Sequence, residues 1–455
     1  MQPAVFGISG LRGIVGADLV PELASHYAAA FGALVGLGTF AVGSDARTSG
    51  PMLASAVTAG LLSVGRDVEQ LGLCPTPTVL HHTRVRNRAG GIIVTASHNP
   101  EEWNGLKFCD RNGRFLLPGE FGRFRDFIER GSFEHTGWRA LGSSSDYPDA
   151  VKDHILSIVS SPVFAPARQR LQSKPLRVGI DAVNGAASVA ALELVRALGC
   201  EPVPLNCDPD AGRSGFPRRP EPTGRNLADL CRLVRNQHLD AGFAFDPDGD
   251  RLGCVSETGS ALGEELTICL AAKYVLPHRK GPVVVNLSTT RGVEDVCADF
   301  KVPVYRSAVG EASVVERMIE SEAVLGGEGN GGVILPEVNF TRDGLVGMAS
   351  VLGLVAFYSR PLSQLASEIP VYRIVKLTLP IDRERFADRR TRLLAEFDGC
   401  RVDERDGLWL GDSDYWVHAR PSNTEPIVRI VAEARTEDAV NEVVNRAKRA
   451  LGGNP

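Results

Sequence analysis

One pattern occurs three times along the chain: a short apolar strand, a polar loop, and then a helical stretch. Strands that alternate with helices in this way are typical of parallel sheets flanked by helices. Such sheets bind ligands at the loops that follow their strands. The three copies therefore predict three related α/β domains. The predicted strand and helix pairs are 40–45 with 52–64, 177–181 with 188–198, and 283–286 with 293–300.

The length of 455 residues also requires several domains, because it exceeds what one hydrophobic core supports. Segments rich in Gly, Ser or Pro are the predicted linkers between domains, at 141–148, 257–260 and 367–370. After the last linker the repeated pattern stops and charge density rises, so a smaller α+β domain is expected there, with a hinge near Pro370. The predicted mixed α/β domains are 1–147, 148–256 and 257–369, and the C-terminal α+β domain is 370–455.

Charge and cysteine content narrow the class of partner and the compartment. The net charge is −5, without a basic stripe, so nucleic acid is not the expected partner. An anionic small molecule needs only a local cationic pocket. The nine cysteines include no CxxC pair, which is typical of reduced thiols in the cytoplasm. We see no signal peptide, and we expect the apolar stretch 27–43 to be a helix running into a buried strand rather than a membrane span.

Ser97 is the first candidate for chemistry. It follows the apolar residues 92–94, on a loop that Pro100 prevents from continuing as a strand. An exposed serine at a strand end suits a nucleophile or a phosphate carrier, but its hydroxyl needs activation. His98 is adjacent, and neighbours on an extended chain point in opposite directions, so a direct Ser–His pair is not implied. The alternative is an ordinary turn.

Three aspartates at alternate positions, Asp246, Asp248 and Asp250, follow another apolar strand. Their oxygens suit a hard cation such as Mg²⁺, and without a metal their charges would raise one another's pKa values. A calcium loop is a rival, because Glu257 stands twelfth from Asp246. However, Arg251 takes the sixth position, where that motif requires glycine, and the flanks resemble strands rather than helices. A solvated acidic turn is the other alternative.

Two further loops carry polar groups suited to a sugar phosphate. The glycine-rich run 326–332 lets a backbone approach a ligand closely, and its Glu328 and Asn330 suit sugar hydroxyls. The run fits neither a dinucleotide-binding nor a P-loop pattern. Residues 420–426, with Arg429, combine arginines and hydroxyls as a phosphate cradle would, although a polar turn between two strands is the alternative. Near the N-terminus, Arg12, Arg47 and Lys107 are cations that, taken singly, resemble surface charges.

Together these motifs resemble those of the α-D-phosphohexomutase family, over essentially the whole chain. They occur in the family's order, on three α/β domains followed by a different fourth. The opening motif is similar too, except that Ile8 replaces the usual threonine. The matching segments are FGISGLRG (6–13), TASHNP (95–100), DPDGDR (246–251), GEGNGG (327–332) and RPSNTEP (420–426).

The resemblance implies a heart-shaped molecule with one loop from each domain in a central cleft. It implies a cytoplasmic enzyme, monomer or homodimer, whose partner is a small phosphosugar rather than nucleic acid or membrane. Ser97 would carry a phosphoryl group and share Mg²⁺ with the three aspartates. Phosphate would move between the 1- and 6-positions of a hexose through a hexose 1,6-bisphosphate that turns around in the cleft.

The resemblance also implies residue roles. Lys107 would act as general acid or base, Arg12 and Arg251 would stabilise charge electrostatically, and His98 would bind or orient. Glu328 and Asn330 would bind the sugar. The cradle for the spectator phosphate would consist of Arg420, Ser422, Asn423, Thr424 and Arg429.

The form of the sugar loop is similar to that of archaeal-type members, which include phosphoglucosamine mutases and dual phosphoglucomutase/phosphomannomutases. Ala308 stands where many relatives have lysine. We therefore favour glucosamine phosphate, whose amino group Glu328 would serve, over glucose or mannose phosphate. A metal-dependent sugar phosphatase and a non-catalytic sugar-phosphate sensor remain alternatives; the intact Ser97 and aspartates argue against the sensor.

Overall fold

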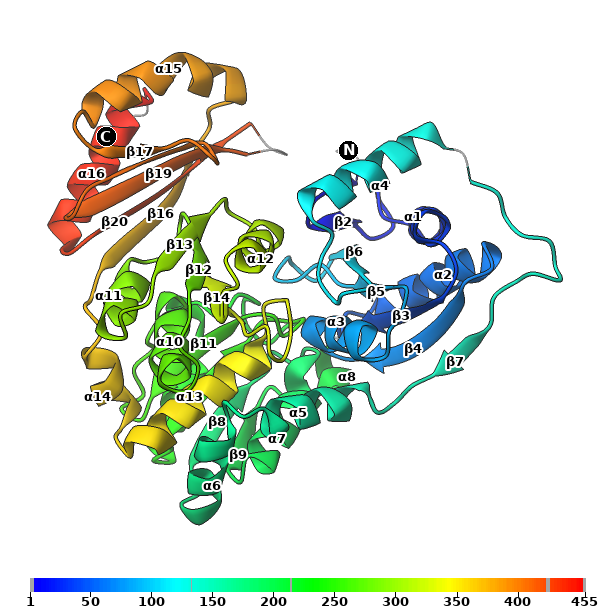
Figure 1. The fold of residues 1–455 in the computed structure, drawn as a ribbon, viewed down its shortest axis with the longest axis horizontal. Helices are drawn as coiled ribbons and strands as arrows, with labels where there is room; N and C mark the ends of the chain where they lie inside the picture. Colours follow the sequence, from blue (N-terminus) through cyan, green and yellow to red (C-terminus); the bar gives the residue numbers. More distant parts are fainter. Residues whose placement is uncertain (1–3, 132, 213–214, 423–425, 453–455) are drawn as a thin grey trace.

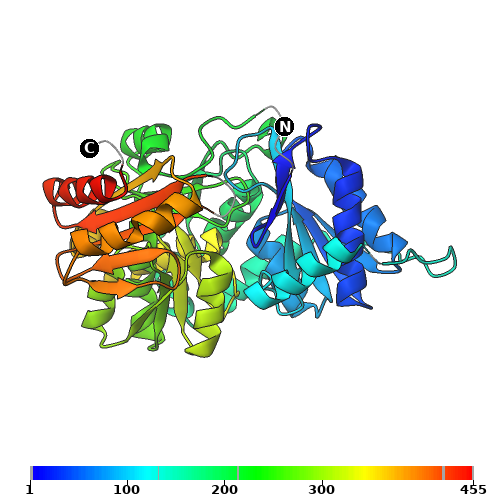
Figure 2. The same ribbon diagram turned by 90° about the horizontal axis from the view of Figure 1, so that it is seen from above.

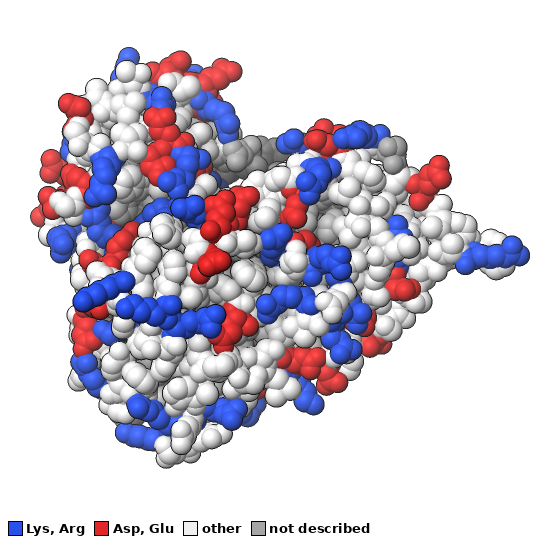
Figure 3. All heavy atoms as spheres, in the orientation of Figure 1, with Lys and Arg blue, Asp and Glu red and all other residues white. Residues whose placement is uncertain are grey.

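The computed structural model describes residues 4–131, 133–212, 215–422 and 426–452. Within them the strands form four separate sheets, and we call the parts built on these sheets units I to IV (Figure 1). In outline the molecule is heart-shaped, with a notch between units I and IV (Figure 3). Viewed from above, units I and IV lie at opposite ends of the molecule (Figure 2).

Unit I has a seven-stranded sheet in the order β1-β2-β6-β5-β3-β4-β7. Its strands are β1 (Val5–Gly7), β2 (Gly10–Ile14), β3 (Thr39–Ser44), β4 (Asp67–Leu73), β5 (Gly90–Val94), β6 (Trp103–Asp110) and β7 (Ser144–Asp146). Its helices are α1 (Pro21–Val35), α2 (Gly50–Ser63), α3 (Thr76–Val85) and α4 (Pro118–Arg130).

Units II and III each have a four-stranded sheet, in the orders β11-β10-β8-β9 and β13-β12-β14-β15. Unit II contains α5 (Ala150–Ser160), α6 (Ala165–Ser173), β8 (Arg177–Asp181), α7 (Ala187–Ala197), β9 (Glu201–Leu205), α8 (Pro209–Gly212), a 3₁₀ turn (Gly224–Asn226), α9 (Ala228–Asn236), β10 (Ala241–Phe245) and β11 (Leu252–Ser256). Unit III contains α10 (Glu265–His278), β12 (Val283–Asn286), α11 (Gly292–Asp299), β13 (Val304–Ser307), α12 (Glu311–Glu320), β14 (Leu325–Glu328), β15 (Gly332–Ile334), α13 (Gly344–Tyr358) and α14 (Leu362–Ser367).

Unit IV is a five-stranded antiparallel sheet, ordered β16-β20-β19-β18-β17, with two helices on one face (Figure 1). The predicted α+β character is therefore confirmed. Its elements are β16 (Arg373–Leu379), α15 (Arg383–Glu396), β17 (Arg401–Asp403), β18 (Leu408–Gly411), β19 (Tyr415–Pro421), β20 (Val428–Ala434) and α16 (Glu437–Ala450).

The threefold repeat predicted from the sequence is confirmed, with one correction. The repeated element in units I to III has three parallel strands, and the next strand in the chain adds antiparallel to them, so the sheets are mixed rather than purely parallel. Unit I has β7 as a fourth parallel strand, next to β4. The antiparallel strand of each repeat follows a short loop, which permits only an antiparallel return. The three loops are equivalent: Ser97 lies between β5 and β6, the aspartates between β10 and β11, and residues 329–331 between β14 and β15.

The cores show which units are joined. One continuous apolar cluster extends through units II and III and includes the helices α10 and α13. Unit IV has its own core, and unit I has one cluster of its own and a second that includes Ala150 of α5 in unit II. Each predicted domain range contains one complete sheet; the exact boundaries stay predictions. Units II and III therefore form one packed body, to which unit IV is attached.

The apolar stretch 27–43 folds as expected, as the end of α1 followed by β3. Among the described residues, no helix is both long and apolar enough to span a bilayer. All nine cysteines are free thiols.

Two helix glycines provide a test of the packing. A Cβ at Gly353 of α13 would lie 2.5 Å from the ring of Tyr274. This ring is fixed, because its hydroxyl donates to the Val163 carbonyl at 2.7 Å. By contrast, a Cβ at Gly122 of α4 would meet no atom within 4 Å. We expect Gly353→Ala to destabilise by about 1–3 kcal/mol through overpacking. The matched Gly122→Ala should be neutral or stabilise by up to about 1 kcal/mol. Urea unfolding measures both, and equal effects would contradict this account.

Candidate active site

Ser97 lies at the end of β5 with its backbone in the left-handed region, at φ 52°. Its Oγ is 3.4 Å from Asp246 Oδ2 of unit II and 3.4 Å from Nδ1 of His98. This serine–histidine contact was not expected from the sequence, because neighbouring side chains on an extended backbone point in opposite directions. The left-handed backbone of Ser97 instead turns the two side chains toward each other. Ser97 is also buried rather than exposed, since unit II covers it. The hydroxyl therefore faces the aspartate cluster.

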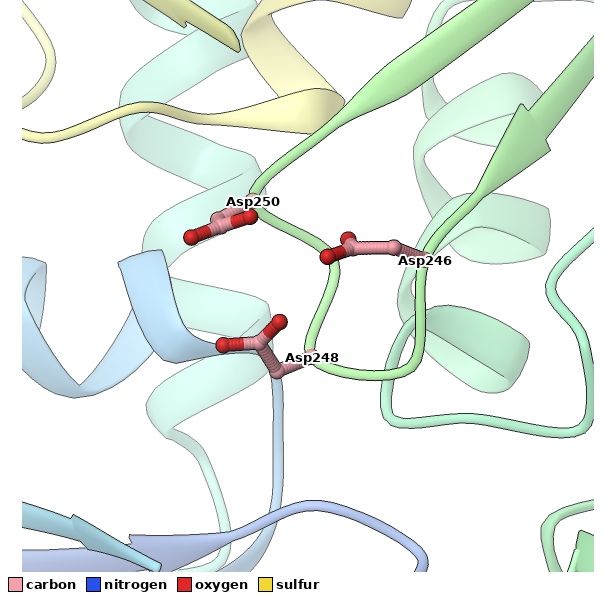
Figure 4. A group of neighbouring side chains, drawn as sticks. All are labelled: Asp246, Asp248 and Asp250. Atoms are coloured by element: carbon pink, nitrogen blue, oxygen red, sulfur yellow. The ribbon is translucent and has the colours of Figure 1, made fainter. Parts of the chain in front are cut away.

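The three aspartates converge, as predicted. One carboxylate oxygen from each lies within 4.8 Å of the others, and all three residues are buried. The carboxylates surround a common space beside the backbone of unit I (Figure 4). Oδ1 of Asp248 and Oδ1 of Asp250 are buried and accept no hydrogen bond from any described residue outside the triad. Such unsatisfied oxygens are costly unless a cation binds them, so the site fits a divalent ion with oxygen ligands such as Mg²⁺.

The electrostatics of the triad are unequal. Burial, together with the charges of Asp250 and Asp248, raises the pKa of Asp246 well above its usual value. Burial also opposes ionisation of Asp250, but Arg342 and Lys107 outweigh it and hold the pKa of Asp250 below its usual range. Three close carboxylates would otherwise favour protonation, because their negative charges repel one another. The cations Lys107 and Arg342, from units I and III, thus keep Asp250 ionised.

Lys107, on β6, is one of these cations. Its Nζ lies 2.6 Å from Asp248 Oδ2 and 3.3 Å from Asp250 Oδ2. Burial lowers the pKa of Lys107, but the two carboxylates outweigh burial and raise it above its usual value. Thr76 at the start of α3 holds the same aspartate, since its Oγ1 donates to Asp248 Oδ2 at 2.7 Å. Unit I therefore contacts the aspartate loop directly, through an ion pair from Lys107 and a hydrogen bond from Thr76.

The remaining predicted cations also reach the site. Arg12 donates to Asn99 Oδ1 at 2.9 Å, and Arg251 pairs with Glu221 at 2.9 Å and lies 3.8 Å from Asp250 Oδ1. The charge of Arg251, followed by burial, lowers the pKa of His98 to about 2, so this imidazole is neutral. Arg47 is buried beneath the Ser97 loop, so the interpretation of this residue as a surface charge is wrong.

Arg342, just before α13, was missed by sequence reasoning. It donates to Asp250 at 2.7 Å, to Glu311 at 3.0 Å and to Glu328 at 2.7 Å. One guanidinium therefore joins the aspartate loop to the glycine-rich loop. No motif signals this role, because the three carboxylates are separated by tens of residues in the sequence.

The glycine-rich loop places Glu328 at the end of β14. Its Oε1 accepts from Asn286 Nδ2 at 2.7 Å, and its Oε2 accepts from Arg342 and, at 3.3 Å, from Asn330. Gly329 is glycine for a packing reason, since a Cβ there would lie 2.0 Å from the Glu265 carboxylate. Glu265 was also missed by sequence reasoning.

A cavity of about 700 Å³ separates this loop from unit IV. Arg420 and Arg429 line its unit IV side, and Glu328 and Asn330 line its unit III side. Of the other predicted cradle residues, Ser422 donates its N–H to the Ile427 carbonyl at 2.8 Å, while Asn423 and Thr424 lie outside the described residues. Further lining groups that the sequence did not single out are Glu265, Lys376 and His418.

The calcium-loop alternative is wrong. Strands flank the aspartates, and Glu257 turns away from them to accept the N–H of Ser363 at 3.0 Å. The solvated-turn alternative is also wrong, because the three aspartates are fully buried.

Comparisons with known proteins agree with this geometry. Four models of phosphoglucomutase/phosphomannomutase match: α/β/α domains I, II and III over residues 3–133, 152–259 and 263–372, and the C-terminal domain over 378–450. A probable phosphoglucosamine mutase of Methanopyrus kandleri is 35% identical, over 96% of this chain and 95% of its own. A phosphoglucomutase/phosphomannomutase of Thermococcus kodakarensis is 34% identical, over 96% of each chain.

Among solved structures, a phosphoglucomutase/phosphomannomutase family protein from Burkholderia thailandensis superposes with a TM-score of 0.84 at 28% identity, covering 99% of both chains. The match extends over all four units, in the same order. The chain therefore belongs to the phosphoglucomutase/phosphomannomutase family of intramolecular phosphotransferases, as its motifs predicted.

Proposed function

We propose that this phosphohexomutase interconverts glucosamine 6-phosphate and glucosamine 1-phosphate through a phosphorylated Ser97. The observation that carries the mechanism is the 3.4 Å separation between Ser97 Oγ and Asp246 Oδ2. A phosphoryl group on that oxygen would stand beside three carboxylates suited to Mg²⁺. A serine far from a metal site would not support phosphoryl transfer.

In the first transfer, a sugar hydroxyl oxygen bonds to the phosphorus, the phosphorus–Oγ bond of Ser97 breaks, and the hydroxyl proton is released. Mg²⁺ held by the aspartates would offset the charge on the transferring oxygens. Lys107, which its raised pKa keeps protonated, is the candidate donor of a proton to the leaving Oγ and then the acceptor of the proton released by the sugar hydroxyl. Arg12 and Arg251 supply positive charge. The second transfer reverses these steps at the other end of the hexose 1,6-bisphosphate.

The spectator phosphate would lie on the unit IV side of the cavity, against Arg420 and Arg429, because guanidinium groups bind phosphate in a bidentate manner. The sugar would then face Glu328 and Asn330. A cavity of about 700 Å³ leaves space for a bisphosphate to exchange its ends.

Two carboxylates on the cavity, Glu265 and Glu328, favour an amino sugar. Glu328 already accepts four hydrogen bonds. Glu265, by contrast, accepts the Thr290 N–H at 3.1 Å and pairs with Lys376 at 2.8 Å. Glu265 is therefore the less engaged of the two carboxylates and the stronger partner for an ammonium group. Burial raises the pKa of Glu265 to about 7 in spite of Lys376, and a bound ammonium would favour its ionised form. The similarity to a probable phosphoglucosamine mutase supports the same sugar.

The role of Ser97 is tested with Ser97→Ala. We expect turnover of glucosamine phosphate to fall by roughly 10³-fold or more, as on removal of a covalent nucleophile, while substrate still binds. Exposed Ser55 on α2 provides the control, and Ser55→Ala should keep full activity. Coupled assays and intact mass after addition of glucose 1,6-bisphosphate measure turnover and phosphorylation. Full activity without Ser97 would refute the mechanism, and free phosphate release in place of isomerisation would identify a phosphatase.

The metal site is tested by calorimetry. Asp250→Asn should weaken Mg²⁺ binding by about tenfold or more, because a charged oxygen ligand is lost. Glu257→Gln should leave Mg²⁺ affinity unchanged, because Glu257 contacts Ser363 instead. Unaltered Mg²⁺ binding in the Asp250 variant would show that the triad is not the metal site.

Sugar preference is tested by comparing kcat/KM for glucosamine, glucose and mannose phosphates. We expect kcat/KM to be highest for glucosamine phosphate. Glu265→Gln should reduce the ratio of this kcat/KM to that for glucose phosphate roughly tenfold, because a charged hydrogen bond is lost. Neighbouring Glu264 also pairs with Lys376 but does not line the cavity, so Glu264→Gln is the control. A wild-type preference for glucose or mannose phosphate would reject the amino sugar.

A further inference from the structure

Arg47 makes an unusually complete set of contacts with the loop that carries Ser97. Its Nε donates to Asp45 Oδ2 at 3.0 Å. One terminal nitrogen donates to the carbonyls of Pro100 at 2.6 Å and Trp103 at 2.9 Å, and the other to those of Ser97 at 2.7 Å and Asn99 at 2.8 Å. All five N–H groups of the guanidinium are therefore used, three of them on the loop and one on Trp103, the first residue of β6.

The same cluster fixes the other side of Ser97. Asp45 accepts a hydrogen bond from Thr95 Oγ1 at 2.6 Å, and Thr95 Oγ1 accepts the Ser97 N–H at 2.9 Å. The Ser97 N–H is thus bound through Thr95 and its carbonyl through Arg47. A left-handed serine is strained and persists only where its surroundings hold it. That conformation directs Oγ toward Asp246.

The contacts of Arg47 are sealed from water. The residue is 2% exposed, and the ring of Phe216 from unit II covers its guanidinium at 5.1 Å. Among the described residues, its side-chain hydrogen bonds go to Asp45 and to residues 97–103 rather than to the aspartate triad, so its role is separate from that of the metal ligands.

We propose that Arg47 is the positioning residue for the nucleophile, which holds the Ser97 loop in the strained conformation that aims Oγ at the metal site. The inference rests on the proposed role of Ser97. It requires the planar fork of arginine, because a lysine ammonium in the same place retains the charge but cannot reach four divergent carbonyls.

Unit I provides a matched arginine away from the site. Arg88 makes a bidentate pair with Glu69, in which its Nε donates to Oε2 at 2.8 Å and a terminal nitrogen donates to Oε1. It resembles Arg47 in its carboxylate partner, but its hydrogen bonds among the described residues go to neither the Ser97 loop nor the aspartate loop. Arg88→Lys is therefore the control for loss of a partly buried guanidinium in general.

The experiment compares Arg47→Lys, Arg88→Lys and wild-type enzyme with glucosamine 6-phosphate. We expect Arg47→Lys to lower kcat by about 10- to 100-fold, the cost of a misplaced reacting group, with KM and calorimetric Mg²⁺ affinity unchanged. Phosphorylation of Ser97 by glucose 1,6-bisphosphate, followed by intact mass, should slow in parallel. Arg88→Lys should keep the wild-type rate of Ser97 phosphorylation.

Wild-type kcat in Arg47→Lys, in an enzyme that Ser97→Ala inactivates, would overturn the inference. So would equal slowing of Ser97 phosphorylation in both lysine variants. Activity in Ser97→Ala would instead overturn the proposed function itself. If Arg47→Lys shows no cooperative melt, Thr95→Val replaces it, since it removes only the hydroxyl between Asp45 and Ser97. A loss of kcat at constant KM then supports the inference, and wild-type kcat rejects it.

Discussion

The burial of three aspartates at one point is the constraint on which the rest of the site depends. Carboxylates out of water and close together oppose one another's ionisation, as the raised pKa of Asp246 shows. The chain balances them with cations from two other units, Lys107 from unit I and Arg342 from unit III. Because each of these cations belongs to a different unit, the ion pairs that balance the charge of the aspartates also hold units I and III against unit II.

The repeat supplies a simple geometric solution to that requirement. Units I, II and III share the order of four strands, β6-β5-β3-β4, β11-β10-β8-β9 and β15-β14-β12-β13. In each, the functional loop connects the third of these strands along the chain to the fourth, which is antiparallel to it. Equivalent loops on equivalent sheets can converge when the sheets pack around a common centre. Three copies of one α/β plan thus provide three loops of different chemistry: a serine, a triad of aspartates that could hold a metal ion, and the carboxylate proposed to bind the sugar.

Sequence reasoning found the residues whose chemistry is concentrated in a short motif, such as Ser97 and the three aspartates. It also located the repeated strands and helices closely, because their apolar patterns are local. It missed Arg342, Glu265 and Lys376, whose partners lie far away in the sequence and meet them only after folding. Arg47 was misjudged for the same reason, since a lone arginine gives no sign that it will be buried under a loop.

Unit IV is attached in a different way from the others. Units II and III share one apolar core, whereas unit IV has its own and reaches unit III through polar contacts. Arg291 donates its N–H to Glu433 at 3.1 Å, and Lys376 pairs with Glu265 at 2.8 Å. Water can replace polar contacts at little cost, whereas exposing a shared apolar core is expensive. Unit I also shares an apolar cluster with Ala150 of α5, so Ser97 and the aspartates lie on units joined by apolar packing. We therefore expect any large movement to occur at unit IV, on the side of the cavity proposed to bind phosphate.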